Sequence, residues 1–177
     1  IIPFYFEIQD LNTWLPSFAL RYYQTFASQY ISFLERDESL VQTSLSLEEI
    51  REYGEKNSIS SFIRDVDELR SHESRGLHDL MWSTAFTAPH RFASTYDQRI
   101  LVILDEFQNI SHYIFRDQAC EKNREVTMAG SYHEYSESKI APMLVTGSYV
   151  GWLSRVLSEY LEGGRLKQIS ISPYLGS

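Results

Sequence analysis

The sequence predicts an α/β protein in which helices cover a mostly parallel sheet. Short apolar runs, typical of buried strands, lie near residues 1–8, 99–105 and 141–146, and an imperfect alternation of apolar and polar residues predicts a further strand at 166–171. Segments with helical spacing of apolar residues separate these runs, and strands that alternate with helices form parallel sheets. A chain of 177 residues is long enough for one domain with a real core.

The first half of the chain predicts one strand and then a series of helices. After the run at 1–8, aromatic residues recur at helical spacing over residues 12–36. Residues 37–98 are polar and helical, and we interpret them as an insertion. Within it, Ser46-Leu-Glu-Glu49 is a capping box that begins a helix. Further helices are expected over 59–69, over 77–86 and from Pro89.

In the second half, three strands are expected to alternate with helices. A short helix is predicted over 110–120, after the strand at 99–105. The strand at 141–146 ends at Gly147-Ser148, and an apolar stripe over 150–161 predicts the next helix. Gly163-Gly164 ends that helix before the strand at 166–171.

Composition excludes several classes of protein. The net charge of -8 gives no clear nucleic-acid surface. One cysteine, Cys120, permits no internal disulfide, which fits a reducing cytoplasm. There is no run of about 18 apolar residues to span a membrane, and no signal peptide. We therefore predict a cytoplasmic protein that does not associate with membranes. Because the chain opens inside an apolar run without an initiator Met, we expect it to be a fragment.

The pair Asp105-Glu106 is the motif that carries the most chemistry. It follows an unbroken apolar run, so the two acids are predicted at the carboxyl end of a buried strand, where open α/β sheets bind ligands. This pattern is the Walker B signature of nucleotide hydrolases, in which one acid holds Mg²⁺ through a water and the next orients the attacking water. The alternative is a helix N-terminus, where acids interact favourably with the helix dipole.

Two other residues have both a structural and a functional interpretation. Ser148 can cap the helix that follows it, or sense a γ-phosphate and the attacking water, and the two roles can coexist. Arg165 can be an ordinary cation near a helix C-terminus, or it can reach a phosphate in cis or across a subunit interface. None of the eight glycines precedes a Lys-Ser/Thr pair, so the sequence encodes no phosphate-binding loop.

Three blocks of sequence, 100–108, 138–153 and 163–174, resemble the archaeal-type ATPases, which are AAA-like P-loop NTPases of the STAND superfamily. The resemblance implies a three-layer α/β/α fold that binds and hydrolyses ATP with Mg²⁺. It places Asp105 on the metal, Glu106 on the catalytic water and Ser148 at a sensor position, and it matches Arg165 to a Gly-Arg element. The family's sheet order is 5-1-4-3-2, and the four predicted strands correspond to strands 2 to 5. Strand 1, which carries the P-loop, is absent from this chain.

We therefore expect residues 1–177 to be a single partial ATPase domain, the C-terminal portion of a core that couples ATP turnover to conformational switching or assembly. On its own the chain is expected to hydrolyse ATP poorly or not at all. The expected partners are nucleotide in the parent protein and a second copy or another protein. The missing strand is expected from another copy, from a shift of the last strand, or from sequence outside this chain. The alternatives are a nucleotide-free scaffold domain and, more weakly, a metal-dependent nuclease that uses Asp105 and Glu106.

Overall fold

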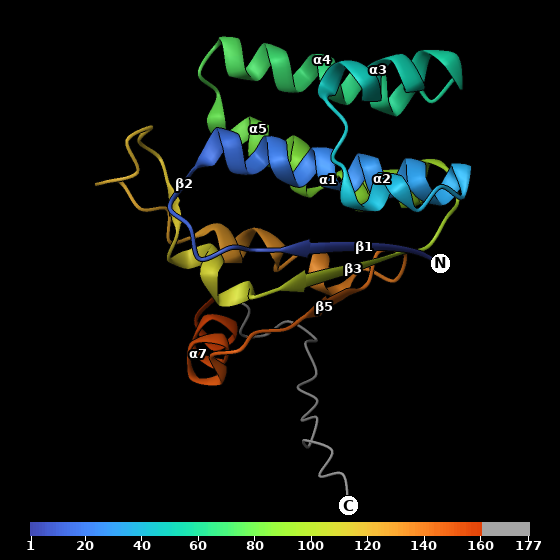
Figure 1. Ribbon diagram of the computed structural model, residues 1–177. Helices are drawn as coiled ribbons and strands as arrows, with labels where there is room; N and C mark the ends of the chain where they lie inside the picture. Colours follow the sequence, from blue (N-terminus) through green and yellow to red (C-terminus); the bar gives the residue numbers. More distant parts are fainter. Residues whose placement is uncertain (161–177) are drawn as a thin grey trace, which may run out of the picture.

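A computed structural model describes residues 1–160, in which helices pack in two layers against one face of a small parallel sheet (Figure 1). The chain forms a mixed α/β fold, as predicted. The strand expected at 166–171 and the candidate Arg165 lie outside the described residues.

The main sheet contains three of the predicted strands in parallel pairing. These are β1 (Ile2–Glu7), β3 (Ile100–Asp105) and β5 (Met143–Val145), in the order β1-β3-β5. Ile2 lies opposite Ile100, and Val102 lies opposite Met143. The order agrees with strands 2, 3 and 4 of the expected sheet, and it makes the strand that ends in Asp105 the central one.

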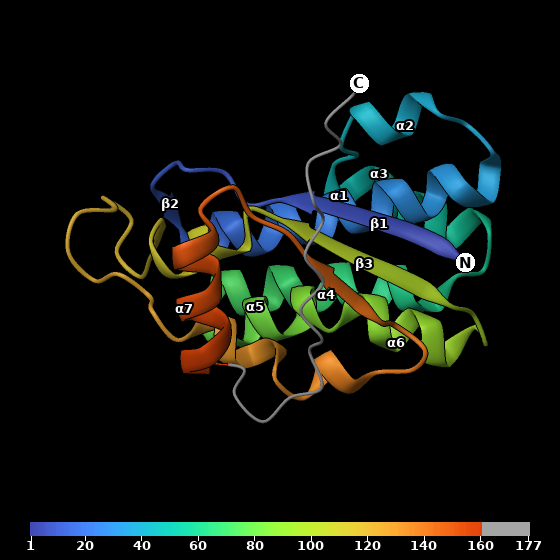
Figure 2. The same ribbon diagram turned by 90° about the horizontal axis from the view of Figure 1, so that it is seen from below.

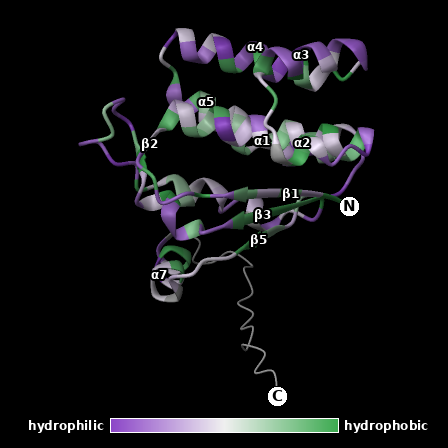
Figure 3. Cartoon of the chain, in the orientation of Figure 1, coloured by the Kyte–Doolittle hydropathy of each residue, from purple (hydrophilic) through white to green (hydrophobic). Residues whose placement is uncertain are grey.

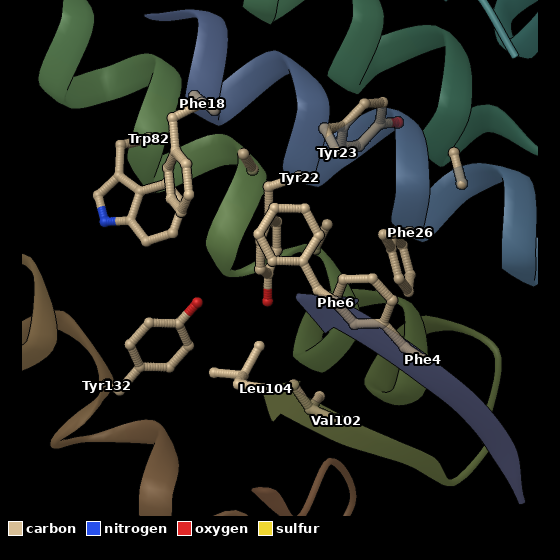
Figure 4. Close-up of a cluster of buried hydrophobic side chains, with 14 of the residues drawn as sticks. Phe4, Phe6, Phe18, Tyr22, Tyr23, Phe26, Trp82, Val102, Leu104 and Tyr132 are labelled. Atoms are coloured by element: carbon tan, nitrogen blue, oxygen red, sulfur yellow. The ribbon is translucent and has the colours of Figure 1, made fainter. Parts of the chain in front are cut away.

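The long helix α1 (Leu15–Glu35) packs its aromatic side chains onto the inner face of β1. Pro16 lies in its first turn, and the helix ends where Arg36 adopts a left-handed conformation with φ of 57°. Tyr22 makes edge-on contacts with Phe4 and Phe6, at ring-centroid distances of 5.1 and 4.9 Å (Figure 4). The helical spacing of aromatics seen in the sequence therefore forms the core between helix and sheet.

Residues 37–98 form the predicted helices, and these share the same hydrophobic core. The capping box is present at Ser46 and Glu49. Figure 1 shows α3 and α4 as an outer layer above α1 and α5. Among the described residues the layers therefore run sheet, helix, helix, which differs from the expected α/β/α order. The helices are α2 (Ser39–Gln42), α3 (Leu47–Lys56), α4 (Ser60–Ser74), α5 (His78–Phe86) and α6 (Ala88–Thr95).

The prediction of a short helix over 110–120 is wrong. A 3-10 helix, η1 (Phe107–Ser111), follows β3, and β4 (Ile114–Phe115) then pairs in parallel with β2 (Thr13–Trp14). The β-branched and aromatic side chains of β4 are buried in this pairing, which overrides the weak helical pattern. Beyond it the Asp117 carboxylate accepts hydrogen bonds from three backbone N–H groups at 121–123, which closes a loop.

The remaining elements complete the described chain around the end of the sheet. Two further 3-10 helices, η2 (Met128–Tyr132) and η3 (Tyr135–Glu137), precede β5. The last helix, α7 (Val150–Tyr160), contacts η1 and η2 beyond the carboxyl ends of the strands. It confirms the helix predicted after Gly147-Ser148.

The second face of the sheet is open in the described part of the chain. Figure 2 looks onto this face: the strands lie in front, and α1, α4 and α5 lie behind them. Tyr5 and Leu144 point to this side and are 44% and 47% exposed. In Figure 3, β3 and β5 are mostly hydrophobic. Both faces of a parallel sheet are normally covered, so a face left uncovered by the described residues is unusual.

The two edges of the sheet differ from each other. At the β1 edge, the Gln29 side chain takes the place of a neighbouring strand: its Nε2 donates to the Tyr5 carbonyl and its Oε1 accepts from the Tyr5 N–H, both at 2.8 Å. At the other edge, Pro142 and Thr146 bond to β3, so the alternating residues Met143 and Val145 direct their backbone groups outward. The β1 edge is closed, whereas β5 ends the described sheet with an open edge.

Candidate functional site

The predicted acids lie where the ends of three parallel strands meet. Asp105 is the last residue of β3, and Glu106 follows it. Thr146 follows β5, and Ser148 lies two residues further on. The fold thus brings Asp105, Glu106 and Ser148 together, as the sequence predicts.

Asp105 is held from both neighbouring strands. Its Oδ2 accepts a hydrogen bond from the Tyr5 hydroxyl of β1 at 2.9 Å. Its Oδ1 accepts from the Thr146 hydroxyl, and also from the Glu106 N–H at 2.9 Å. The Thr146 hydroxyl chiefly, with help from Tyr5, lowers the pKa of Asp105 against the opposing effect of partial burial. The hydrogen bond between Tyr5 and Asp105 also raises the pKa of Tyr5 to about 12. At neutral pH the carboxyl group of Asp105 is therefore ionised and the phenol of Tyr5 is not.

Glu106 occupies a strained backbone position. Its φ of 52° and ψ of 41° lie in the left-handed region, which residues other than glycine rarely adopt. Such strain, typically about 1–3 kcal/mol, persists where the surroundings hold it, often at functional sites. Here the turn from β3 into η1 brings the Glu106 carboxylate against the segment that follows β5.

Both oxygens of Glu106 accept hydrogen bonds. The Ser148 hydroxyl donates to Oε1, and the Ser148 N–H donates to Oε2 at 3.2 Å. The Gln108 amide also donates to Oε2. The Ser148 hydroxyl is the main cause of a pKa for Glu106 below its ordinary value, although desolvation opposes it. Ser148 therefore contacts the second acid directly, which is the position predicted for a sensor residue.

Three side chains of the site, those of Tyr5, Gln108 and Thr146, were not predicted. Tyr5 lies in a run in which nearly every residue is apolar, so the sequence does not show which residues face the ligand side. Thr146 is the one polar residue of the strand predicted at 141–146, and that was an available signal. Gln108 lies two residues after the acid motif, and an amide in itself indicates no particular chemistry, so only its contacts reveal its place in the site.

The donor set is made of oxygen atoms, which suits Mg²⁺. Among residues 1–160 no group of three or more His, Cys, Asp or Glu side chains is placed to hold a metal. A Mg²⁺ ion at Asp105 would accordingly take most of its ligands from water and phosphate, as this ion commonly does. The residues fit a metal shared with a phosphate ligand and do not fit a cage made by the protein alone.

A small cavity elsewhere in the fold does not include the acids. It lies between the helices and the sheet, and its lining includes Tyr22, His90 and Tyr132. Figure 4 shows the hydroxyl groups of Tyr22 and Tyr132 pointing toward one another in this region. Burial raises the pKa of both phenols, so they remain neutral. The cavity therefore belongs to the hydrophobic core, whereas the ionised carboxylates lie at the ends of the strands.

Among the described residues no helix is long and apolar enough to cross a membrane. No protein-family model, curated protein or solved structure matches the chain. The resemblance to archaeal-type ATPases thus stays a prediction, based on three sequence blocks.

Proposed function

We propose that this chain is the C-terminal portion of an ATP-binding and ATP-hydrolysing P-loop NTPase core, whose parent couples turnover to conformational switching or assembly. One observation carries the proposal: two ionised carboxylates lie at the end of the central strand of a parallel sheet, and a serine that follows the neighbouring strand contacts the second. Ligands of open α/β sheets bind at this edge. The resemblance of the sequence blocks adds to that geometry.

Each residue then has a distinct role. Asp105, fixed by Tyr5 and Thr146, would hold Mg²⁺ through a water molecule, and the ion supplies neutralisation of phosphate charge. Glu106 would orient the attacking water and accept its proton. Ser148 would contact the γ-phosphate, and its hydrogen bond to Glu106 would make the position of that carboxylate depend on whether the phosphate is bound. Arg165, which lies outside the described residues, would contact a phosphate in cis or across a subunit interface if it is more than an ordinary cation near a helix C-terminus.

The open edge of the sheet supports the part of the proposal that concerns the missing phosphate-binding unit. Gln29 closes the β1 edge, whereas no strand of residues 1–160 pairs with the outer edge of β5 next to the site. A strand paired with β5 and continued by a helix over the open face would cover Tyr5 and Leu144, and would bring a phosphate-binding loop beside Ser148. Such a unit would also complete the α/β/α layers expected from the resemblance.

The test compares ATP binding and hydrolysis by this chain and by the natural protein that carries it. Glu106→Gln should lower kcat by about 10²-fold or more with ATP binding retained, because it removes the base but not the phosphate contacts. Glu7→Gln is the matched control, since Glu7 is an exposed acid at the end of the neighbouring strand. A rate that Glu106→Gln leaves unchanged would contradict the proposal.

The second candidate is a nucleotide-free scaffold domain. It is favoured by the absence of a Gly-x-x-x-x-Gly-Lys-Ser/Thr segment from the sequence. Natural sequence upstream of residue 1 separates the two candidates: such a segment within about 40 residues, the length of one strand–loop–helix unit, supports the ATPase. Its absence, together with no binding of ATP and Mg²⁺ by the natural protein, supports the scaffold.

A further inference from the structure

Gln108 is a fully buried polar residue beside the candidate catalytic acid. It lies in η1, two residues after Glu106, and is 0% exposed. Its Nε2 donates a hydrogen bond to Glu106 Oε2, whereas its Oε1 is buried and has no hydrogen-bond partner. A buried amide oxygen without a donor is unfavourable, so the orientation of this side chain needs a cause.

The charge of Glu106 supplies that cause. If the Gln108 amide were rotated by half a turn, its oxygen would face the ionised carboxylate, and two acceptors would meet without a proton between them. Leaving Oε1 unpaired is the smaller cost, because a hydrogen bond to a charged group is about twice as strong as a neutral one. The amide is therefore oriented by Glu106 and not by its own packing.

Gly147 provides the space into which the unpaired oxygen projects. A Cβ atom built on Gly147 would lie 2.0 Å from Gln108 Oε1 and 3.0 Å from its Cδ, which is impossible without movement. Gly147 does not adopt the left-handed backbone conformation that favours glycine; among the described glycines only Gly76 does. A side chain at this position would therefore force the Gln108 amide to move.

We propose that Gln108 is a positioning residue that holds the Glu106 side chain in one orientation against Ser148, and that Gly147 makes this possible. This inference rests on the proposed function, because it assigns Gln108 to the orientation of the water-directing acid. Two elements then fix the carboxylate: η1 through Gln108, and the segment after β5 through Ser148. A general base must be held in its productive geometry, and small displacements cost large factors in rate.

The first test replaces Gln108 by Met, which keeps the length of the side chain and removes the donor. The readout is the rotamer population of Glu106, from NMR three-bond couplings in this chain, together with the chemical shift of the Ser148 N–H. We expect one rotamer in the wild type and averaging over several in Gln108→Met. The exposed Gln118→Met is the control. A single, unchanged rotamer in Gln108→Met would show that Gln108 only fills space.

The second test uses Gly147, so that it does not depend on the folding of Gln108→Met. Gly147→Ala should lower the melting temperature when Gln108 is present and have little effect in a Gln108→Ala background, where the obstructing amide is gone. Equal losses in both backgrounds would overturn the role of Gly147.

A kinetic readout in the natural protein separates this inference from the proposed function. Gln108→Met should lower kcat for ATP by about 10- to 100-fold with KM unchanged. An active enzyme whose kcat is unaffected refutes the positioning role alone. If the natural protein does not hydrolyse ATP, the proposed function fails, and the NMR and stability tests still decide whether Gln108 positions Glu106.

Discussion

The ion pair between Asp65 and Arg91 joins three of the helices behind the sheet. Asp65 of α4 is fully buried and accepts hydrogen bonds from Arg91 Nη1 at 2.8 Å and from Arg91 Nη2 at 2.9 Å. Arg91 belongs to α6, and its Nη2 also donates to the Thr84 carbonyl of α5 at 2.7 Å. Replacing Arg91 by Met keeps most of its apolar length and leaves Asp65 buried without its main partner.

The expected loss follows from this burial. Removing one partner of a buried, hydrogen-bonded ion pair costs about 3–5 kcal/mol, because the remaining charge stays desolvated. Arg64 still contacts Asp65 Oδ1 at 3.1 Å, but its side chain is half exposed and screened by water. We therefore expect Arg91→Met to lower the free energy of unfolding by about 3 kcal/mol. The double variant Asp65→Leu/Arg91→Met should recover most of this loss, because it buries no unpaired charge.

Urea unfolding, followed by the fluorescence of the three tryptophans, measures both variants. Arg51→Met is the control, since Arg51 pairs with Glu55 and Asp67 at the surface, and a smaller loss is expected there. The reasoning fails if Arg91→Met loses less than about 1 kcal/mol, the range of an exposed pair. It also fails if the double variant is less stable than the single one.

Three further predictions concern single contacts. Folding raises the pKa of Tyr5 to about 12, so the stabilisation that Tyr5 gives is complete below its ordinary pKa of 10 and is lost as pH rises through about 12. Tyr5→Phe should therefore remove one tyrosinate transition near pH 12 from an ultraviolet absorbance titration. The loss of a transition near pH 10 would contradict this. Gln29→Ala should speed hydrogen exchange of the Tyr5 amide, which now donates to Gln29 Oε1 at 2.8 Å, and an unchanged rate would refute the edge-closing role. Gly54→Ala should lower the free energy of unfolding in urea by about 1 kcal/mol. The new Cβ would lie 2.9 Å from the Cβ of Phe62, and this overpacking costs about 1–3 kcal/mol, whereas the gain in helix propensity is about 1 kcal/mol. A stabilised variant would show that the helices move apart freely.

The features predicted from the sequence are those set by short segments. The apolar run that ends at Asp105 is buried on its inner face wherever the rest of the chain goes, so the strand and the place of the acids follow from it. The helix with aromatics at every fourth position, and the capping box at Ser46, are equally local. The expected parallel pairing also agrees with the structure, because helices between strands require crossover connections.

Contacts between distant segments could not be predicted in the same way. The run at 1–8 is apolar at nearly every position, so it shows no alternation to reveal that Tyr5 faces the acids while Phe4 and Phe6 face α1. Tyr5 meets Asp105 across 100 residues of sequence, and Thr146 meets it across 41. These pairs depend on strand register, which a single sequence without alternation does not specify. The side of the sheet on which the helices at 37–98 lie could not be predicted for a related reason, because an amphipathic helix does not show which side of a sheet it covers.

The two acids differ in how they depend on β5. Asp105 is held by Tyr5 of the closed β1 edge as well as by Thr146, so a movement of β5 leaves one of its anchors in place. Among the described residues Glu106 makes no hydrogen bond to β1; its donors are Gln108 and Ser148, and Ser148 belongs to the segment that follows β5. A strand that paired with β5 and shifted it would therefore change the surroundings of Glu106 before those of Asp105. Under the proposed function, the carboxylate that would hold the metal therefore keeps its surroundings when β5 moves, whereas the carboxylate that would direct the water does not.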